Sequence, residues 1–420
     1  MKKCHIPLLV IAAFTLLQLA VLVVFGYTPY PDSDGYLNLA RECVTQGEPY
    51  PTHRQLAELP FIWNMGAINA VYCSLRLFGT AYPLLVVYSV LKGVTAWLVY
   101  KTAERLANTK TALIALTIYV LYLPNYGEGT SFHSELPFTF LCMLAFWLMV
   151  CKQRFVWGGI VLAIANWVRP FALVFLVAML VYLLLFRKQR LRHIVQLSAS
   201  YAVAVCFIGA GCFLRTGHFL YQAKTGWMAL MQYHWDHDTD QQSDRHLFAC
   251  GDPTKVPDEC FNYQQRDSLW HHNFFKWLPD NKGEYARQIP YKVMKTYVSD
   301  NCNLCALMNK QQKAAPYMYA PISMERLRLD FPHYQTIQWL TVYNLLFYYI
   351  LMLLTLLSIG KVIRNKPLWI FVIIPLLGTI FIALVGHGET RFHQPFMPFL
   401  IILAAIRLTT WLRIKKGRSF

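Results

Sequence analysis

Two aspartates follow the first long apolar run of this chain, in the segment Tyr30–Tyr36. Asp32 and Asp34 stand where a membrane-spanning helix would emerge into water. An acidic side chain at that depth is costly and is therefore a candidate for function. A carboxylate can take a proton from a hydroxyl group, and two adjacent carboxylates can hold a divalent cation such as Mg²⁺ or Mn²⁺. The pair predicts a catalytic base, and a metal site remains an open alternative.

Other ionisable residues recur at later boundaries between apolar runs. One such residue alone is most simply a capping or solvated group at a helix end. When several connections between spans place acids and arginines at the same depth, however, they predict a shared site. The residues are Glu135 at the start of the fourth run, Arg169 between the fifth and sixth, and Glu389, Arg391 and His393 between the ninth and tenth.

Lys92 is unusual because it lies well inside the second apolar run. A lysine can extend to the membrane surface from a helix end, but from the middle of a span it more readily faces a polar cavity. We predict that Lys92 assists in binding a lipid phosphate.

The composition is that of a membrane protein. The 420 residues are 56% hydrophobic and 15% charged, with a mean hydropathy of +0.34, which is unusual for a soluble domain. The apolar residues occur in runs of about 20, the length that crosses a bilayer. The first run is predicted to be an anchor rather than a signal peptide, because no small-residue cleavage site follows it. The predicted spans are 6–26, 82–104, 111–127, 134–151, 155–168, 171–187, 194–213, 337–360, 367–386 and 395–412.

The basic residues predict the orientation of these spans. Lysine and arginine clusters fall at every second boundary, and such clusters mark cytoplasmic loops. Both termini are therefore predicted to be cytoplasmic. These clusters in the cytoplasmic loops account for most of the formal charge of +17. A nucleic-acid partner is not predicted, because no soluble domain presents a basic groove.

Two loops are predicted on the opposite face, at 27–81 and 214–336. They divide the chain into an N-terminal membrane module at 1–213, a large extracytoplasmic region at 214–336 and C-terminal spans at 337–420. Apolar spacing predicts helices over Asp34–Gln46 and Leu59–Phe78 in the first loop, the second lying along the membrane surface.

The outer loops also contain cysteines and histidines. An even number of cysteines on an oxidising face favours disulfides, whose pairing the sequence does not decide. A zinc site at His234 and His237 is a less favoured alternative, because zinc needs three or four convergent ligands. The cysteines are Cys43, Cys73, Cys250, Cys260, Cys302 and Cys305.

A polyprenyl-phosphate sugar suits this arrangement as a donor, because the outer face of a membrane lacks nucleotide sugars. Transfer needs a base for the acceptor hydroxyl, for which Asp32 is placed. It also needs cations for the departing phosphate. Arg169 and Arg391 suit this role, because each guanidinium can bind a phosphate through two parallel hydrogen bonds. The acceptor could be a glycan, a lipid or a protein.

Several motifs resemble the GT-C glycosyltransferases, in particular the bacterial branch related to protein O-mannosyltransferases and the lipid A aminoarabinose transferase. The similar segments are Pro31-Asp32-Ser-Asp34-Gly-Tyr36, Leu59–Gly79, His133-Ser-Glu135-Leu-Pro, Asn166-Trp-Val-Arg169-Pro170 and Gly388-Glu389-Thr-Arg391-Phe-His393-Gln-Pro395. The chain departs from that pattern where Leu59-Pro60 replaces a double proline and where the loop at 214–336 is long.

The resemblance implies an all-α GT-C bundle of about ten transmembrane helices, with juxtamembrane helices in the first outer loop. It implies an inverting glycosyltransferase in a bacterial inner membrane, with Asp32 as the base. Asp34 and Glu135 would orient the acceptor, Glu389 would position Arg391, and Tyr36 and His393 would support the site. Two alternatives stay open. A polysaccharide polymerase or O-antigen ligase would depend on loop arginines such as Arg245, Arg266 and Arg287, and a lipid or glycan transporter would show internal repeats.

Overall fold

Each of the ten predicted spans contains a helix in the computed structural model, which describes residues 5–186, 190–230, 262–301, 303, 304, 307 and 336–417. The predicted span 111–127 is interrupted, because its helix ends at Leu121 and a short separate helix, α7 (Pro124–Glu128), follows. Within these residues, six helices are long and apolar enough to cross a membrane by length and composition, and four shorter apolar helices lie among them. The helices are α1 (His5–Phe25), α5 (Tyr82–Leu106), α6 (Thr109–Leu121), α8 (Glu135–Phe146) with a π-helical turn (Trp147–Cys151), α9 (Phe155–Val168), α10 (Ala172–Phe186), α11 (Arg190–Thr216), α17 (Thr336–Val362), α18 (Ile370–Val385) and α19 (Met397–Gly417).

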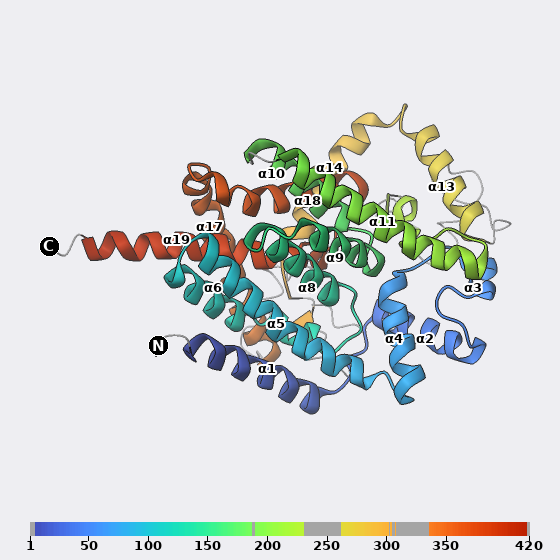
Figure 1. Ribbon diagram of the computed structural model, residues 1–420, viewed down its shortest axis with the longest axis horizontal. Helices are drawn as coiled ribbons and strands as arrows, with labels where there is room; N and C mark the ends of the chain where they lie inside the picture. The colour runs from blue at the N-terminus through green and yellow to red at the C-terminus, as the bar shows by residue number, and fades with distance from the viewer. Residues whose placement is uncertain are drawn as a thin grey trace.

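The long helices form a bundle with two distinct ends. The start of α1 and the end of α19 lie at one end of the bundle, while α2, α3, α4 and α13 lie at the other (Figure 1). In the interior, α9 packs against α8 and α11, and α19 packs against α6 and α17. Many apolar side chains on α1, α11 and α17 are exposed, as expected for surfaces that face lipid. The chain is thus a multi-pass membrane protein.

The first loop folds into three short helices, α2 (Pro31–Gln46), α3 (His53–Glu58) and α4 (Met65–Phe78). The predicted helix over Leu59–Phe78 is wrong in its first turns, because it begins only at Met65. Pro60 lacks a backbone N–H and disfavours helix at the residue before it. The earlier helix α3 was not predicted, although Thr52 and Gln55 form a capping box at its start,.

The described part of the second loop includes the helices α13 (Tyr263–Trp277) and α14 (Lys282–Tyr297). Helix α14 packs on α18, where the Tyr297 hydroxyl lies 2.7 Å from that of Thr379. Residues 222–230, here called the strap, cross from the end of α11 toward the first loop. The Lys224 backbone N–H donates to the Ile62 carbonyl at 2.8 Å, and this bond fixes the strap to the first loop.

The predicted disulfides are not seen where the structure can test them. Cys43 is buried and free, and Cys73 is exposed and free. The remaining residues of those predictions lie outside the described part of the chain: Cys250, Cys260, Cys302, Cys305, His234 and His237.

Candidate active site

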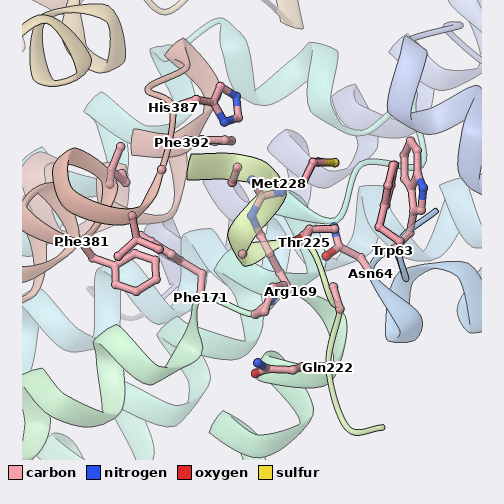
Figure 2. A pocket seen from close by; sticks show the side chains of 18 of the residues that line it. Trp63, Asn64, Arg169, Phe171, Gln222, Thr225, Met228, Phe381, His387 and Phe392 are labelled. Atoms are coloured by element: carbon pink, nitrogen blue, oxygen red, sulfur yellow. The ribbon is translucent and has the colours of Figure 1, made fainter. Parts of the chain in front are cut away.

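A cavity of about 510 Å³ opens at the end of the bundle that carries the first loop. Its walls come from α2, the Arg169 connection after α9, the strap, and the loop after α18. Figure 2 shows Arg169 near the centre, with Phe171 and Phe381 on one side and Trp63 and Asn64 on the other. Asp32 and Arg391 also line the cavity. The structure therefore brings residues from distant parts of the sequence into one space.

Two guanidinium groups lie among three carboxylates at this cavity. Arg391 Nη1 lies 2.5 Å from Asp32 Oδ2, and Arg391 Nε lies 3.0 Å from Glu389 Oε2. Arg169 Nη1 lies 2.8 Å from Glu135 Oε1, which is also 3.6 Å from Arg391 Nε. Asp32 is the most exposed of the three carboxylates, with 27% of its side chain accessible. It is the acid that a substrate in the cavity can reach.

The start of α2 separates the two aspartates. Pro31 occupies the first turn of this helix, where its missing N–H costs nothing,. Asp32 turns toward Arg391, whereas Asp34 accepts a hydrogen bond from the Tyr27 hydroxyl at 2.5 Å. Since the two carboxylates have different partners and one of these is a cation, they do not fit a shared divalent ion. Within the described ranges, no three His, Cys, Asp or Glu side chains come together as metal ligands.

Close packing of α4 on α9 positions Arg169. A Cβ atom at Gly66 would lie 2.8 Å from the Cα atom of Val168, so only glycine permits this approach at the residue before Arg169. Arg169 donates to the Ser134 hydroxyl at 2.9 Å and lies over the Phe392 ring at 5.3 Å. Its guanidinium is therefore held from two sides.

Asn64 and Ser134 are site residues that the sequence reasoning missed. The Asn64 amide donates to the Tyr36 hydroxyl at 2.6 Å and to the Ser134 hydroxyl at 3.0 Å. Ser134 in turn accepts from Arg169. A chain of hydrogen bonds thus joins α2 to Arg169. The only signal in the sequence was that Asn64 precedes a helical run and Ser134 precedes Glu135.

The loop between α18 and α19 places Glu389 against Arg391. Gly388 has a φ angle of +73°, which favours glycine,. A Cβ atom there would also lie 2.7 Å from the Lys292 carbonyl oxygen of α14. Burial alone would raise the pKa of the Glu389 carboxyl, but Arg391 and His387 hold that pKa below its ordinary value. Glu389 is therefore a carboxylate that orients Arg391, as its motif implied.

His393 does not line the cavity. Its side chain is completely buried, with Nδ1 2.6 Å from the Thr296 carbonyl oxygen and Nε2 3.4 Å from Asp300 Oδ2. These contacts join the 3-10 segment before α19 to the end of α14 and the residues that follow it. The predicted support of the site by His393 is thus indirect, through the packing of α14.

Lys92 also lies away from the cavity, inside the bundle. Its ammonium group contacts the Glu128 carboxylate and the Asn125 side-chain oxygen, the latter at 3.0 Å. Lys92 and Glu128 are 3% and 4% exposed. Lys92 therefore has a carboxylate partner of its own, and the contacts do not support its predicted binding of a lipid phosphate.

The Lys92–Glu128 pair is expected to control stability. Lys92→Met should lower the free energy of unfolding by about 3–5 kcal/mol, because it leaves a buried carboxylate without its cation. The double variant with Glu128→Gln should recover much of that loss. Thermal unfolding of the purified protein measures both.

Lys101→Met is the matched control on the same helix. Lys101 pairs with Glu104 at 2.8 Å, but its side chain is 37% exposed, so its loss should cost at most about 1 kcal/mol. Equal unfolding temperatures for Lys92→Met and the wild type would contradict a structural role of the buried pair.

The other side of the cavity is apolar and reaches the bundle surface. Phe171 lies just before α10, Leu173 lies in its first turn, and the α18 residues at this side are Phe381, Ile382 and Val385. These two helices pack together, and Leu173 is 50% exposed. The cavity is therefore polar beside Asp32 and apolar between α10 and α18.

Comparison with known proteins supports a glycosyltransferase. Residues 69–211, about a third of the chain, match the dolichyl-phosphate-mannose-protein mannosyltransferase family. This region contains Glu135 and Arg169 but neither Asp32 nor Arg391. No curated protein matches the chain significantly.

A solved structure shows the fold. The apo form of an oligosaccharyltransferase from Archaeoglobus fulgidus is similar over 99% of this chain, with a TM-score of 0.55 and 12% sequence identity. The chain spans about half the length of that protein, since the similarity covers 52% of it. The chain thus has the predicted all-α GT-C fold, and the two comparisons together support a GT-C glycosyltransferase.

Proposed function

We propose that this protein transfers a sugar from a polyprenyl-phosphate donor to a hydroxyl group of a glycan, lipid or protein acceptor. We place the reaction at the extracytoplasmic face of a membrane, the bacterial inner membrane being the proposed location, with both termini in the cytoplasm. One observation carries the proposal. A single cavity combines a reachable carboxylate, two guanidinium groups and an apolar end between α10 and α18.

The proposed reaction is a single displacement with inversion. Asp32 accepts the proton of the acceptor hydroxyl while the hydroxyl oxygen forms a bond to the anomeric carbon. The bond from that carbon to the phosphate oxygen breaks, and its electron pair stays on the phosphate. Arg169 and Arg391 stabilise the added negative charge, because charged donors fixed in a site act strongly where charge develops. The aspartic acid then releases its proton to water.

The resting contacts suggest an order of binding. Arg391 is occupied by Asp32 at 2.5 Å and by Glu389 at 3.0 Å. A phosphate that reaches the cavity competes with Asp32 for this guanidinium, since both are oxyanions. Donor binding would therefore free the Asp32 carboxylate for the acceptor hydroxyl. We propose that the donor binds first.

The donor tail is assigned to the apolar end of the cavity. An isoprenoid chain with its phosphate at Arg169 would pass Phe171 and Phe381 and leave the protein between α10 and α18. Burial of such a chain contributes about 25 cal/mol per Å² of apolar surface. The tail would thus contribute binding energy while the guanidinium groups fix the reacting end.

A donor panel tests the proposed function. The purified protein is incubated with polyprenyl phosphates that carry different sugars, each with and without acceptor glycans, and the released lipid phosphate is measured. We expect release with at least one donor, dependent on the acceptor. Failure of the whole panel, with donors shown to enter the same detergent or nanodisc, would count against the reaction.

The alternative enzymes find less support in the structure. Arg266 lies on α13 and Arg287 on α14, and neither lines the cavity that contains Asp32. Arg245 is outside the described residues.

Asn64 is expected to act as a positioning residue in this reaction. Asn64→Ala removes the donor that joins Tyr36 to Ser134, at a cost of about 0.5–1.5 kcal/mol per hydrogen bond. We expect kcat to fall roughly 2- to 10-fold while KM for the donor changes little. A purely structural role would instead lower the amount of active protein, with no change of kcat per active molecule, as titration of active sites would show.

A further inference from the structure

The strap separates two cavities. Thr225 and Met228 line the cavity that contains Asp32 (Figure 2), whereas Lys224 and Trp227 line a second cavity. The strap is held at the first loop by the backbone bond between Lys224 and Ile62. One short segment therefore forms a wall of both spaces.

The second cavity, here called the outer cavity, lies between the strap, the residues that follow α11, and α13. Its volume of about 470 Å³ is in the range of small-molecule sites,. Polar side chains line it in a connected row. His218 Nδ1 lies 2.9 Å from the Tyr263 hydroxyl and 3.3 Å from the Gln264 amide nitrogen.

The charges of the outer cavity balance each other. Lys224 and Asp267 both line it, and the described residues around it therefore carry no surplus charge that would select an anion or a cation. Burial raises the pKa of the Asp267 carboxyl, and Lys224 and His271 oppose that shift. A neutral ligand with hydroxyl groups can donate hydrogen bonds to this carboxylate and accept them from the lysine.

Trp227 provides a fixed aromatic wall. Its ring meets the His271 ring edge-on, with centroids 4.6 Å apart, and the Phe275 ring at 5.7 Å. Both partners belong to α13, so the indole is held between the strap and a helix. An aromatic ring beside hydrogen-bonding groups matches a sugar ring, which has apolar C–H faces and a polar hydroxyl edge.

We propose that the outer cavity is a carbohydrate-binding subsite that holds the remote part of a neutral glycan acceptor. That the bound glycan is an acceptor rests on the proposed function. Binding of a sugar at this cavity does not itself require sugar transfer. An acceptor that reaches Asp32 from the aqueous side passes the strap. Its further sugar units would then rest on Trp227 and bond to Asp267 and His218.

Direct binding tests this subsite. Full-length protein in nanodiscs is titrated with three neutral trisaccharides, built of mannose, glucose and N-acetylglucosamine, and binding is followed by saturation-transfer NMR. The same titrations use Asp32→Asn, Trp227→Ala and Asp267→Asn. Asp280→Asn is the matched control, because Asp280 follows α13 and is exposed but does not line the outer cavity.

We expect saturable binding of at least one trisaccharide by the wild type, by Asp32→Asn and by Asp280→Asn. Trp227→Ala and Asp267→Asn should each weaken this binding at least tenfold. If loss of the Trp227 indole disturbs the fold, Asp267→Asn still tests the subsite, because asparagine has nearly the same size and shape as aspartate. Absence of binding to the wild type, or equal binding to Asp267→Asn, would overturn the subsite. Loss of sugar transfer with binding intact would instead contradict only the proposed function.

Discussion

Asp32→Asn is expected to lower the rate of sugar transfer by about 10²- to 10⁴-fold, the usual contribution of a positioned general base. The asparagine fills the same space but takes no proton. Folding should change little, because 27% of the Asp32 side chain is exposed and its pairing with Arg391 is at the cavity surface. Release of lipid phosphate from the donor, measured with and without acceptor, gives the rate.

Asp34→Asn is the matched control for this experiment. Asp34 is two residues away on the same helix but bonds to Tyr27 and does not line the cavity. Its replacement should leave at least a large part of the activity. If Asp34→Asn were inactive and Asp32→Asn active, the roles assigned to the two aspartates would be reversed.

Arg391→Ala is expected to have the second large effect. Loss of a fixed charged donor at the leaving group costs about 10²- to 10³-fold in kcat. The change should also destabilise the protein, because Asp32, Glu135 and Glu389 lose a shared cation,. Both the transfer rate per folded molecule and the unfolding temperature are therefore measured.

Arg391→Lys separates charge from geometry. A lysine keeps the positive charge but offers no planar fork to a phosphate or to two carboxylates. We expect the unfolding temperature to recover in part while the transfer rate stays well below that of the wild type. Full activity of Arg391→Lys would show that paired contacts to the phosphate are unnecessary.

The membrane helices were predictable because their signal is local. A run of about 20 apolar residues predicts a span whatever it packs against, and each of the ten runs contains a helix. The break before α4 was missed because Phe61 and Ile62 fit the apolar spacing of a helix, and this pattern hid the break that Pro60 introduces. In the structure Ile62 instead bonds to the strap at Lys224, a contact between segments far apart in the sequence.

The site was predictable only as a set of helix ends. Topology places Asp32, Arg169 and Arg391 at one face, and the structure brings them to one cavity. Topology does not say which side chains point inward. Lys92 bonds to Glu128 and His393 to Thr296 inside the fold, and Asn64 joins the site through hydrogen bonds that no spacing rule indicates.

A structure with bound lipid phosphate tests the central claim most directly. Asp32→Asn protein in nanodiscs would be imaged by electron cryomicroscopy with a short-chain polyprenyl phosphate. We expect the phosphate between the guanidinium groups of Arg169 and Arg391, with the isoprenoid chain between α10 and α18. A phosphate bound out of reach of both arginines, at Lys92 or on another face of the bundle, would contradict the account.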